Sequence, residues 1–381
     1  MKNKRYVLLF LPLIFFSSCS KNSEKISESS EEIKESQTIP SKTYAINVES
    51  EHGDVLLEKR RVAENSEVKF EVATEYNYFV EYIDIKGDTF QTSFDGELDE
   101  YSFVMPSESV TISVTYRHIN RLLKTIAHRG LNKDLDELGN PVWMNCPNTE
   151  KAFKAAGKRN FYGMETDVHK TKDNRWVCTH DLDIKSNGVS KVISEFTYDE
   201  LVNMPMDDQE GKKDENGNVY QDTICSLDKY LEIGKRYKKV CLIEFKESIN
   251  TPYLSKEDIK EVVDLVKNIS SINNVMFISF YLEDLLAVKE FEQSAKCQYL
   301  ISNETSETAS QGSIEDKINN AIKYKLDGSF YSGLCSNENV KKIHNANLEV
   351  NCWTVNTKEG ADIYIPHGID YLTTDSVYYE N

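Results

Sequence analysis

The sequence predicts an α/β protein built as a TIM (β/α)8 barrel, preceded by a small all-β module. From about residue 122 onward, short apolar runs alternate with amphipathic helical stretches, the pattern of βα units in a parallel sheet. About eight such units in about 255 residues suit a TIM barrel. Between residues 43 and 117, apolar and polar residues instead alternate with the period of half-buried strands.

The first 19 residues resemble an export signal. A basic start precedes the apolar run Tyr6–Phe16, which is too short to span a bilayer comfortably. The following Ser-Ser-Cys resembles a bacterial lipobox in which Cys19 would be lipidated, although Phe16 stands where such motifs usually carry an aliphatic residue. We therefore expect an exported protein, lipid-anchored to the outer face of the bacterial cell membrane. A cleaved signal with an incidental cysteine is the alternative.

Residues 20–41 are rich in Ser, Glu and Lys and cannot bury enough surface to fold, so they predict a disordered linker. The whole chain carries a formal net charge of -18. A surface of that sign repels nucleic acid, whose binding needs clustered Lys and Arg. We therefore expect no nucleic-acid partner. The oligomeric state is left open by the sequence.

Residues 42–118 are predicted to form the all-β module, with about five or six strands. The clearest runs of alternation are Tyr44–Val48, Glu67–Val72 and Val110–Tyr116, separated by Gly-containing turns. The segment Tyr101–Tyr116 resembles the end of repeat modules in bacterial surface proteins, which finish in a Met-Pro-x-x-x-Val-Thr pattern. We expect a spacer in preference to a specific binder.

Residues 122–381 are predicted to form the barrel. Its expected strands are Leu123–Ala127, Tyr162–Val168, Trp176–Thr179, Val240–Phe245, Val275–Ser279, Gln298–Ile301, Glu349–Thr354 and Tyr371–Thr373. Its expected helices are Asn148–Ala156, Ile259–Ile269, Ile314–Lys323 and Asn339–Ala346. The active site of a TIM barrel lies at the carboxyl ends of its strands. The candidate catalytic and metal-binding residues described below lie at or near the carboxyl ends of these expected strands.

Two carboxylates are the most informative of these residues. Glu165 and Asp167 are two positions apart, so on a strand both side chains face the same way. Convergent carboxylates favour a hard divalent cation with oxygen ligands. His128 and His180 are candidate proton carriers beside it, and Arg129 suggests a phosphate group. The set indicates metal-assisted phosphoester chemistry.

The order and spacing of these motifs resemble the glycerophosphodiester phosphodiesterase family, over roughly residues 122 to 378. Any single motif is weak, but their common order over about 250 residues is a strong signal. The motifs are A-H-R-G (127–130), M-E-T-D-V (164–168), T-H-D (179–181), L-I-E-F-K (242–246), F-I-S-F (277–280), N-C-W-T-V-N (351–356) and G-I-D-Y-L-T-T-D (368–375).

The resemblance implies a metal site and an acid/base pair. Glu165, Asp167 and Glu244 match the family's ligands for one divalent cation, Ca²⁺ or Mg²⁺. His128 and His180 match its acid/base pair, without indicating which does which job. A neighbouring glycerol hydroxyl would attack first, and water would then open the resulting cyclic phosphate.

The resemblance also implies a substrate pocket. Arg129 and Lys246 would hold phosphate oxygens, although Lys246 shares the strand face of Glu244 and would equally suit a salt bridge to it. Trp353 resembles an aromatic residue near the family's glycerol pocket, with a core position as the alternative. His169 is expected to point away from Asp167 and is left outside the site.

The predicted reaction hydrolyses a glycerophosphodiester to glycerol 3-phosphate and an alcohol. The substrate would be a small molecule or a glycerophosphate polymer of the envelope. One alternative is a lipid phosphodiesterase of the phosphatidylinositol phospholipase C or sphingomyelinase D type, which needs exposed apolar loop residues, and only residues 142–144 offer a small wedge. Another is a surface binding protein without catalysis, suggested by Pro147, which stands where the family usually carries Glu before an Asn-Thr pair.

The eight cysteines form no C-x-x-C pattern. Buried unpaired thiols are the preferred interpretation. Export would favour disulfides instead, and both possibilities stay open.

Overall fold

The computed structural model describes residues 42–96, 98–119, 123–135, 141–246, 253–303 and 312–376. The predicted signal and linker, residues 1–41, lie outside this part of the chain. Within it, no helix combines the length and apolar character that crossing a membrane requires.

The N-terminal region is a β-sandwich of two sheets that share one core. A five-stranded sheet has the order β3-β1-β8-β5-β6, and a three-stranded sheet has the order β2-β4-β7. The strands are β1 (Thr43–Glu49), β2 (Gly53–Leu57), β3 (Arg61–Ala63), β4 (Glu67–Thr74), β5 (Tyr78–Lys86), β6 (Gln91–Asp95), β7 (Tyr101–Val104) and β8 (Val110–His118). The small all-β module is confirmed, with more strands than the five or six expected.

Alternation along the strands builds the core of this sandwich. Val68 and Phe70 of β4 point inward, as do Ile83 and Ile85 of β5, while their neighbours face outward. Met105 is fully buried after β7, and its backbone exchanges hydrogen bonds with residues 65 and 66. The Met-Pro pair therefore closes the core and ends the strand.

The second region is a closed barrel of eight parallel strands. The order is β12-β19-β20-β21-β22-β23-β24-β9, and β9 pairs with β12 to complete the ring. The strands are β9 (Lys124–Ala127), β12 (Gly163–Lys170), β19 (Val240–Phe245), β20 (Val275–Ser279), β21 (Lys296–Ile301), β22 (Asp327–Tyr331), β23 (Val350–Trp353) and β24 (Tyr371–Thr374). The TIM barrel is confirmed.

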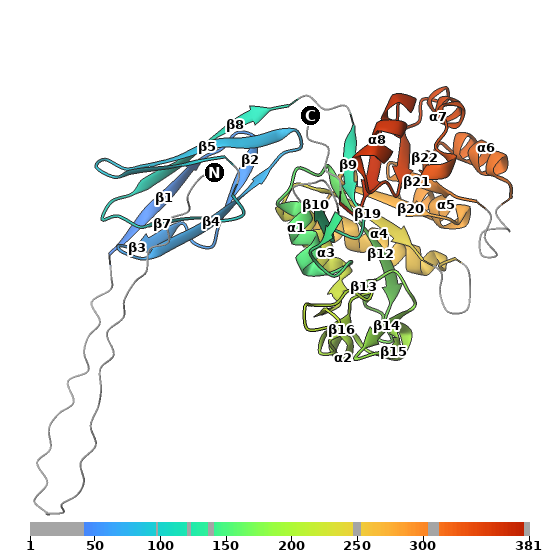
Figure 1. Ribbon diagram of the computed structural model, residues 1–381, viewed down its shortest axis with the longest axis horizontal. Helices are drawn as coiled ribbons and strands as arrows, with labels where there is room; N and C mark the ends of the chain where they lie inside the picture. The colour runs from blue at the N-terminus through green and yellow to red at the C-terminus, as the bar shows by residue number, and fades with distance from the viewer. Residues whose placement is uncertain are drawn as a thin grey trace, which may run out of the picture. The chain divides into compact units, whose positions relative to one another are not determined.

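Helices other than α2, which lies between β15 and β16, follow the barrel strands along the chain and cover them from outside (Figure 1). Most begin at a Ser or Thr side chain that accepts a hydrogen bond from a first-turn backbone N–H. The helices are α1 (Glu150–Gly157), α2 (Tyr198–Val202), α3 (Leu227–Arg236), α4 (Lys256–Ile269), α5 (Leu282–Phe291), α6 (Ile314–Tyr324), α7 (Asn337–His344) and α8 (Lys358–Tyr364).

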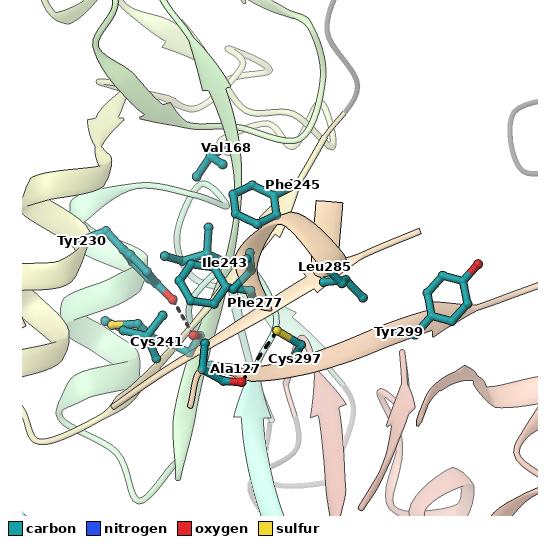
Figure 2. Close-up of a cluster of buried hydrophobic side chains, with 14 of the residues drawn as sticks. Ala127, Val168, Tyr230, Cys241, Ile243, Phe245, Phe277, Leu285, Cys297 and Tyr299 are labelled. Atoms are coloured by element: carbon teal, nitrogen blue, oxygen red, sulfur yellow. Dashed lines mark hydrogen bonds between the residues drawn. The ribbon is translucent and has the colours of Figure 1, made fainter. Parts of the chain in front are cut away.

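Two apolar layers stabilise the barrel. Outward-facing strand residues such as Ile243 and Phe277 pack against the helices, with Phe245 and Phe277 stacked 5.6 Å apart (Figure 2). The alternate residues, including Leu242 and Met276, form a separate cluster made of strand side chains. By the period of a strand this second cluster fills the barrel interior.

One of the eight predicted barrel strands was wrong. The segment Trp176–Thr179 forms β13 (Trp176–Cys178), which is antiparallel to β12 and lies outside the ring. The missing barrel strand is β22, which the sequence analysis did not find. Its residues Asp327-Gly328-Ser329 carry the composition of a turn, so they gave no strand signal.

Additional short strands follow β9 and β13 along the chain and are not part of the barrel ring. They are β10 (Lys133–Leu135) with β11 (Pro141–Trp143), β14 (Asp183–Ser186) with β15 (Val189–Val192), β16 (Met206–Asp207) with β17 (Gln221–Asp222), and β18 (Cys225–Ser226) with β13. The insert between β13 and β18 has a small apolar core of its own, which includes Ile184, Leu201 and Met206.

Candidate active site

A cavity of about 130 Å³ lies at the carboxyl ends of the barrel strands. One wall is charged and the other combines apolar and neutral polar groups. The lining residues are His128, Arg129, Glu165, His180, Glu244, Lys246, Ile278, Phe280, Leu300, Ser329, Asn351, Trp353 and Thr373. Seven of the eight predicted site residues are among them, and the eighth, Asp167, lies in contact with Arg129 and Lys246.

Three carboxylates form the base of the charged wall. Glu165 and Asp167 alternate along β12, and Asp167 stands directly opposite Glu244 of the neighbouring β19. One oxygen from each residue lies within 4.8 Å of the others, and all three side chains are buried. Strand alternation and parallel register thus bring the predicted ligand set together.

Burial of three like charges separates their pKa values. Burial, Asp167 and Glu244 raise the pKa of Glu165 well above its ordinary value. Burial also raises the pKa of Glu244 to about 7. Burial opposes ionisation of Asp167 too, but the charges of Lys246 and Arg129 lower its pKa well below the usual range. The cluster is therefore short of positive charge.

Two cations contact these carboxylates. Lys246 Nζ lies 2.5 Å from Glu244 Oε1 and 3.0 Å from Asp167 Oδ1. Arg129 donates its backbone N–H to Glu165 Oε2 at 2.8 Å, and its Nε lies 3.4 Å from Asp167 Oδ2. Lys246 thus forms the salt bridge to Glu244 that was the alternative to a phosphate-binding role. Lys246 and Arg129 also line the cavity, so the salt bridge does not exclude contact with a substrate.

His128 is oriented by a carboxylate from the last barrel strand. Its Nδ1 lies 2.7 Å from Asp375 Oδ1, and Asp375 also contacts Lys133 Nζ at 3.2 Å and Asn356 Nδ2 at 2.6 Å. Burial opposes ionisation of Asp375, yet its hydrogen bond with His128 and the charges of His128 and Lys133 lower its pKa. An ionised Asp375 would accept a proton carried on Nδ1 of His128, which would leave Nε2 as the unprotonated ring nitrogen.

His180 is oriented in a similar way by its chain neighbour. Its Nδ1 lies 2.7 Å from Asp181 Oδ1, and the preceding Thr179 donates its N–H to the Asp167 carbonyl at 3.0 Å. Burial lowers the pKa of His180, and the charges of Lys246 and Arg129 contribute. His180 follows β13, which is antiparallel to β12 and lies outside the ring of barrel strands. Its side chain nevertheless lines the same cavity as His128.

His169 does not point away from the site. Its Nε2 lies 3.1 Å from the backbone oxygen of His180. The expectation was wrong because residues 167 and 169, two apart on one strand, share a face. His169 contacts the segment that carries His180.

Asn148 is a supporting residue that was expected only as the start of the helix Asn148–Ala156 and not as part of the site. Thr149 is the actual cap of α1. Asn148 is fully buried, donates from Nδ2 to Asp167 Oδ2 at 3.0 Å and accepts from Thr166 Oγ1 at 2.8 Å. The sequence signal that could have indicated this role is the position of Asn148 in the Pro-Asn-Thr run, which resembles a motif of the family. Asp375, in the T-T-D run, was missed in the same way.

Aromatic groups form part of the opposite wall. Trp353 lies at the end of β23 and donates from Nε1 to the Ser329 carbonyl at 3.1 Å. Its ring meets those of Phe280 and Tyr331 edge-on, each at 5.7 Å between centroids. Trp353 thus packs against other aromatic rings and also lines the cavity. The core position and the pocket position predicted as alternatives for Trp353 are therefore compatible.

The carboxylates fit a hard divalent cation. Glu165 Oε1 is buried and has no hydrogen-bond partner among the described residues. Buried acceptors without partners are rare, and a bound cation would satisfy this one. The three carboxylates contact only two cationic side chains among the described residues, Lys246 and Arg129, so a bound cation would balance the remaining negative charge. Oxygen donors of this kind are those that Ca²⁺ and Mg²⁺ prefer.

Carboxylates, histidines and cations gathered at the strand ends of a parallel barrel are suited to an enzyme that hydrolyses phosphodiesters. The chain belongs to the glycerophosphoryl diester phosphodiesterase family, whose model matches residues 128–378.

The chain is also similar to known proteins in sequence and in structure. A protein of Mycoplasma genitalium described as uncharacterized is 30% identical over 245 residues, which cover 63% of this chain and 89% of the relative. The structure of an Oleispira antarctica phosphodiesterase in complex with the product sn-glycerol-3-phosphate is similar, with a TM-score of 0.51, 20% identity, and coverage of 67% of this chain and 93% of that one. A glycerophosphodiester phosphodiesterase from Agrobacterium tumefaciens matches with a TM-score of 0.50, 15% identity, and coverage of 67% and 96%. At these identities the two structures support the fold.

Proposed function

We propose that the protein hydrolyses glycerophosphodiesters to glycerol 3-phosphate and an alcohol, in a metal-dependent reaction with two histidines as acid and base. The observation that carries the proposal is that His128, His180, Glu165 and Glu244 line one cavity, and that Asp167 lies close enough to Glu165 and Glu244 to complete a carboxylate triad. The product named for the Oleispira antarctica phosphodiesterase is consistent with it.

Glu165, Asp167 and Glu244 would hold one divalent cation, Ca²⁺ or Mg²⁺. The cation would act as a Lewis acid on a phosphoryl oxygen. Arg129 and Lys246 lie on the same side of the cavity and would offset the charge that develops on the phosphate.

His128 and His180 would carry the protons. Each has Nδ1 paired with a carboxylate, so each offers Nε2 to the substrate. One withdraws a proton from the attacking glycerol hydroxyl, and the other protonates the departing alkoxide. Water then opens the cyclic phosphate with the roles reversed. The wall formed by Phe280 and Trp353 would receive the carbon skeleton of the substrate.

A soluble diester suits the site better than a membrane lipid. Trp143, the largest residue of the small apolar wedge, stacks on Tyr220 at 3.9 Å and donates from Nε1 to Asp208 at 3.1 Å. Val142 and Met144 beside it are exposed, but Trp143 is held against the protein and is not free to insert. A polymer of glycerophosphate remains a possible substrate of the same chemistry.

We further propose that the protein is exported and lipid-anchored at Cys19, with residues 20–41 as a tether, residues 42–118 as a spacer module and residues 122–381 as the catalytic barrel. The basic, apolar and Ser-Ser-Cys order of the first 19 residues supports the anchor. Metabolic labelling with a fatty acid, compared between the natural chain and Cys19→Ala, tests it. Equal labelling would exclude the anchor.

The test of the activity is release of glycerol 3-phosphate from glycerophosphocholine by the full chain. It is run with calcium, magnesium or chelator, beside His128→Ala and Glu165→Ala, and with His118→Ala, on the exposed end of β8, as control. We expect metal-dependent release that both site variants lose and the control keeps. Release unaffected by the site variants would overturn the assignment, and no release from folded protein would favour a binding protein.

A further inference from the structure

Two cysteines lie directly opposite each other where the insert leaves the barrel. Strands β13 and β18 are antiparallel, and Cys178 is the register partner of Cys225. Residues directly opposite in an antiparallel pair project to the same side of the sheet. Both side chains are buried, with exposed fractions of 0% and 4%.

The separation of these residues suits a covalent bond. Directly opposed residues of antiparallel strands have Cα atoms about 4.5 or about 5.5 Å apart, according to the hydrogen-bonding pattern. A disulfide needs a Cα separation of about 4.4–6.8 Å, so either pattern permits one. The Cys178 thiol also raises the pKa of the Cys225 thiol, as a close neighbour does. The Cα separation expected from the register therefore meets the distance requirement of a disulfide.

We propose that Cys178 and Cys225 form a disulfide that joins the two ends of the insert, residues 179–224. The insert begins with Thr179 and His180 and returns to the barrel just before Ser226, which caps α3. The bond would hold the strand that precedes His180 against the start of α3. It would also reduce the freedom of the insert in the unfolded chain, which stabilises the fold.

The reaction is a thiol–disulfide exchange with a small-molecule or protein disulfide. One cysteine thiolate attacks the external disulfide, forms a mixed disulfide and releases one thiol. The second cysteine thiolate then attacks the mixed disulfide, forms the Cys178–Cys225 bond and releases the second thiol. The two cysteines lose two protons and two electrons, and the external disulfide gains them.

The folded structure slows this exchange. The hydrogen bond with Cys178, together with burial, raises the pKa of the Cys225 thiol, so thiolate is scarce in the native state. We therefore expect the bond to form during folding, before the pair is enclosed. The Cys335 thiol likewise raises the pKa of Cys352, so these two are a second candidate pair and a thiol count alone cannot identify the bond.

The experiment maps the bond by mass spectrometry. The full chain is unfolded, reduced and refolded with excess oxidised glutathione, and free thiols are then blocked with N-ethylmaleimide. Trypsin would place Cys178 in the peptide 176–185 and Cys225 in the peptide 214–229. We expect these two peptides to be recovered linked. Folded protein incubated with oxidised glutathione in mild urea is mapped alongside, in case the chain does not refold.

Variants and melting test the consequence. Cys225→Ser should abolish the link, whereas Cys297→Ser, at another buried cysteine, should retain it. Closing a loop of roughly 50 residues should raise the melting temperature by roughly 5–10 °C in oxidised protein, and Cys225→Ser should lose that redox-dependent shift. Recovery of both peptides separately blocked under both treatments would overturn the proposal, as would Cys178 linked to a different cysteine.

Discussion

His128 Nδ1 lies 2.7 Å from Asp375 Oδ1, although the two residues are at opposite ends of the barrel sequence. Strands β9 and β24 pair in parallel, and His128 follows one while Asp375 follows the other. Closure of the ring therefore orients the imidazole that we propose as a proton carrier.

Asp375→Asn should lower kcat for glycerophosphodiester hydrolysis by about 10²-fold or more, with a smaller change in KM. The neutral amide is a weaker acceptor than the carboxylate, and its NH2 group can donate to Nδ1 instead, which favours the other tautomer of His128. Steady-state kinetics on glycerophosphocholine measures the effect, and Asp181→Asn beside the more exposed His180 is the comparison. An unchanged kcat for Asp375→Asn would show that the pair is only structural.

Glu165→Gln should abolish stabilisation of the fold by divalent cations. A ligand present at about 100 times its Kd stabilises the native state by about 2.7 kcal/mol, which appears as a higher melting temperature. Glutamine keeps the size of the side chain but loses the charge. Scanning calorimetry with calcium, magnesium or chelator gives the measurement, with Glu338→Gln on the exposed face of α7 as control. An equal metal response in both variants would place the cation elsewhere.

Asn148→Gly should weaken cation binding by about 10- to 100-fold, because Asn148 positions Asp167 through a buried hydrogen bond. Asn148 has φ of 59°, so glycine removes the side chain without straining the backbone. Asn148→Ala should show the same loss of affinity plus a further loss of stability of about 1 kcal/mol. Titration calorimetry separates the two effects. Unaltered affinity in the glycine variant would exclude the positioning role.

Gly130→Ala should destabilise the barrel more than Gly188→Ala. Both glycines have φ of 77°, so both variants meet the same backbone strain, about 1 kcal/mol. A Cβ at Gly130 would lie 2.7 Å from the Ala152 backbone carbon, whereas one at Gly188 would meet nothing within 4 Å. The clash should add about 1–3 kcal/mol. Urea denaturation of both variants provides the comparison, and equal losses would contradict the packing explanation for the glycine of the A-H-R-G motif.

Asp284→Asn should stabilise the protein increasingly as the pH rises from about 4 to about 7. Burial raises the pKa of Asp284 to about 7, while its ordinary value is 3.8. In this window the folded state keeps a proton that the unfolded state has released, so stability falls as the pH rises from the ordinary pKa toward the folded pKa and levels off above it. Asparagine removes this loss, which is a few kcal/mol at most. Denaturation at several pH values tests it, with exposed Asp264→Asn as control. Parallel pH profiles for the natural chain and Asp284→Asn would refute the expectation.

Local patterns were sufficient to predict much of the barrel. Val240–Phe245 and Val275–Ser279 form strands with the predicted bounds, because continuous apolar runs bounded by turns are typical of buried parallel strands. Helices α3, α5 and α8 and strand β22 were not predicted. In β22 Ser329 is fully buried and lines the cavity, and a Cβ at Gly328 would lie 3.1 Å from Ile343 of α7, so both positions need small residues for reasons that are not visible along the chain.

The sequence by itself determined which groups stand at strand ends and which of them share a face. Glu165 and Asp167 converge because a strand has a period of two, and this needs no knowledge of other strands. Only the tertiary structure decided the partners of those groups. Asp375 reaches His128 because the ring closes, and Asn148 reaches Asp167 because the loop before α1 folds over β12. Cys178 meets Cys225 because β18 returns beside β13. Each of these contacts joins distant segments, whereas periodicity reports only on neighbours along the chain.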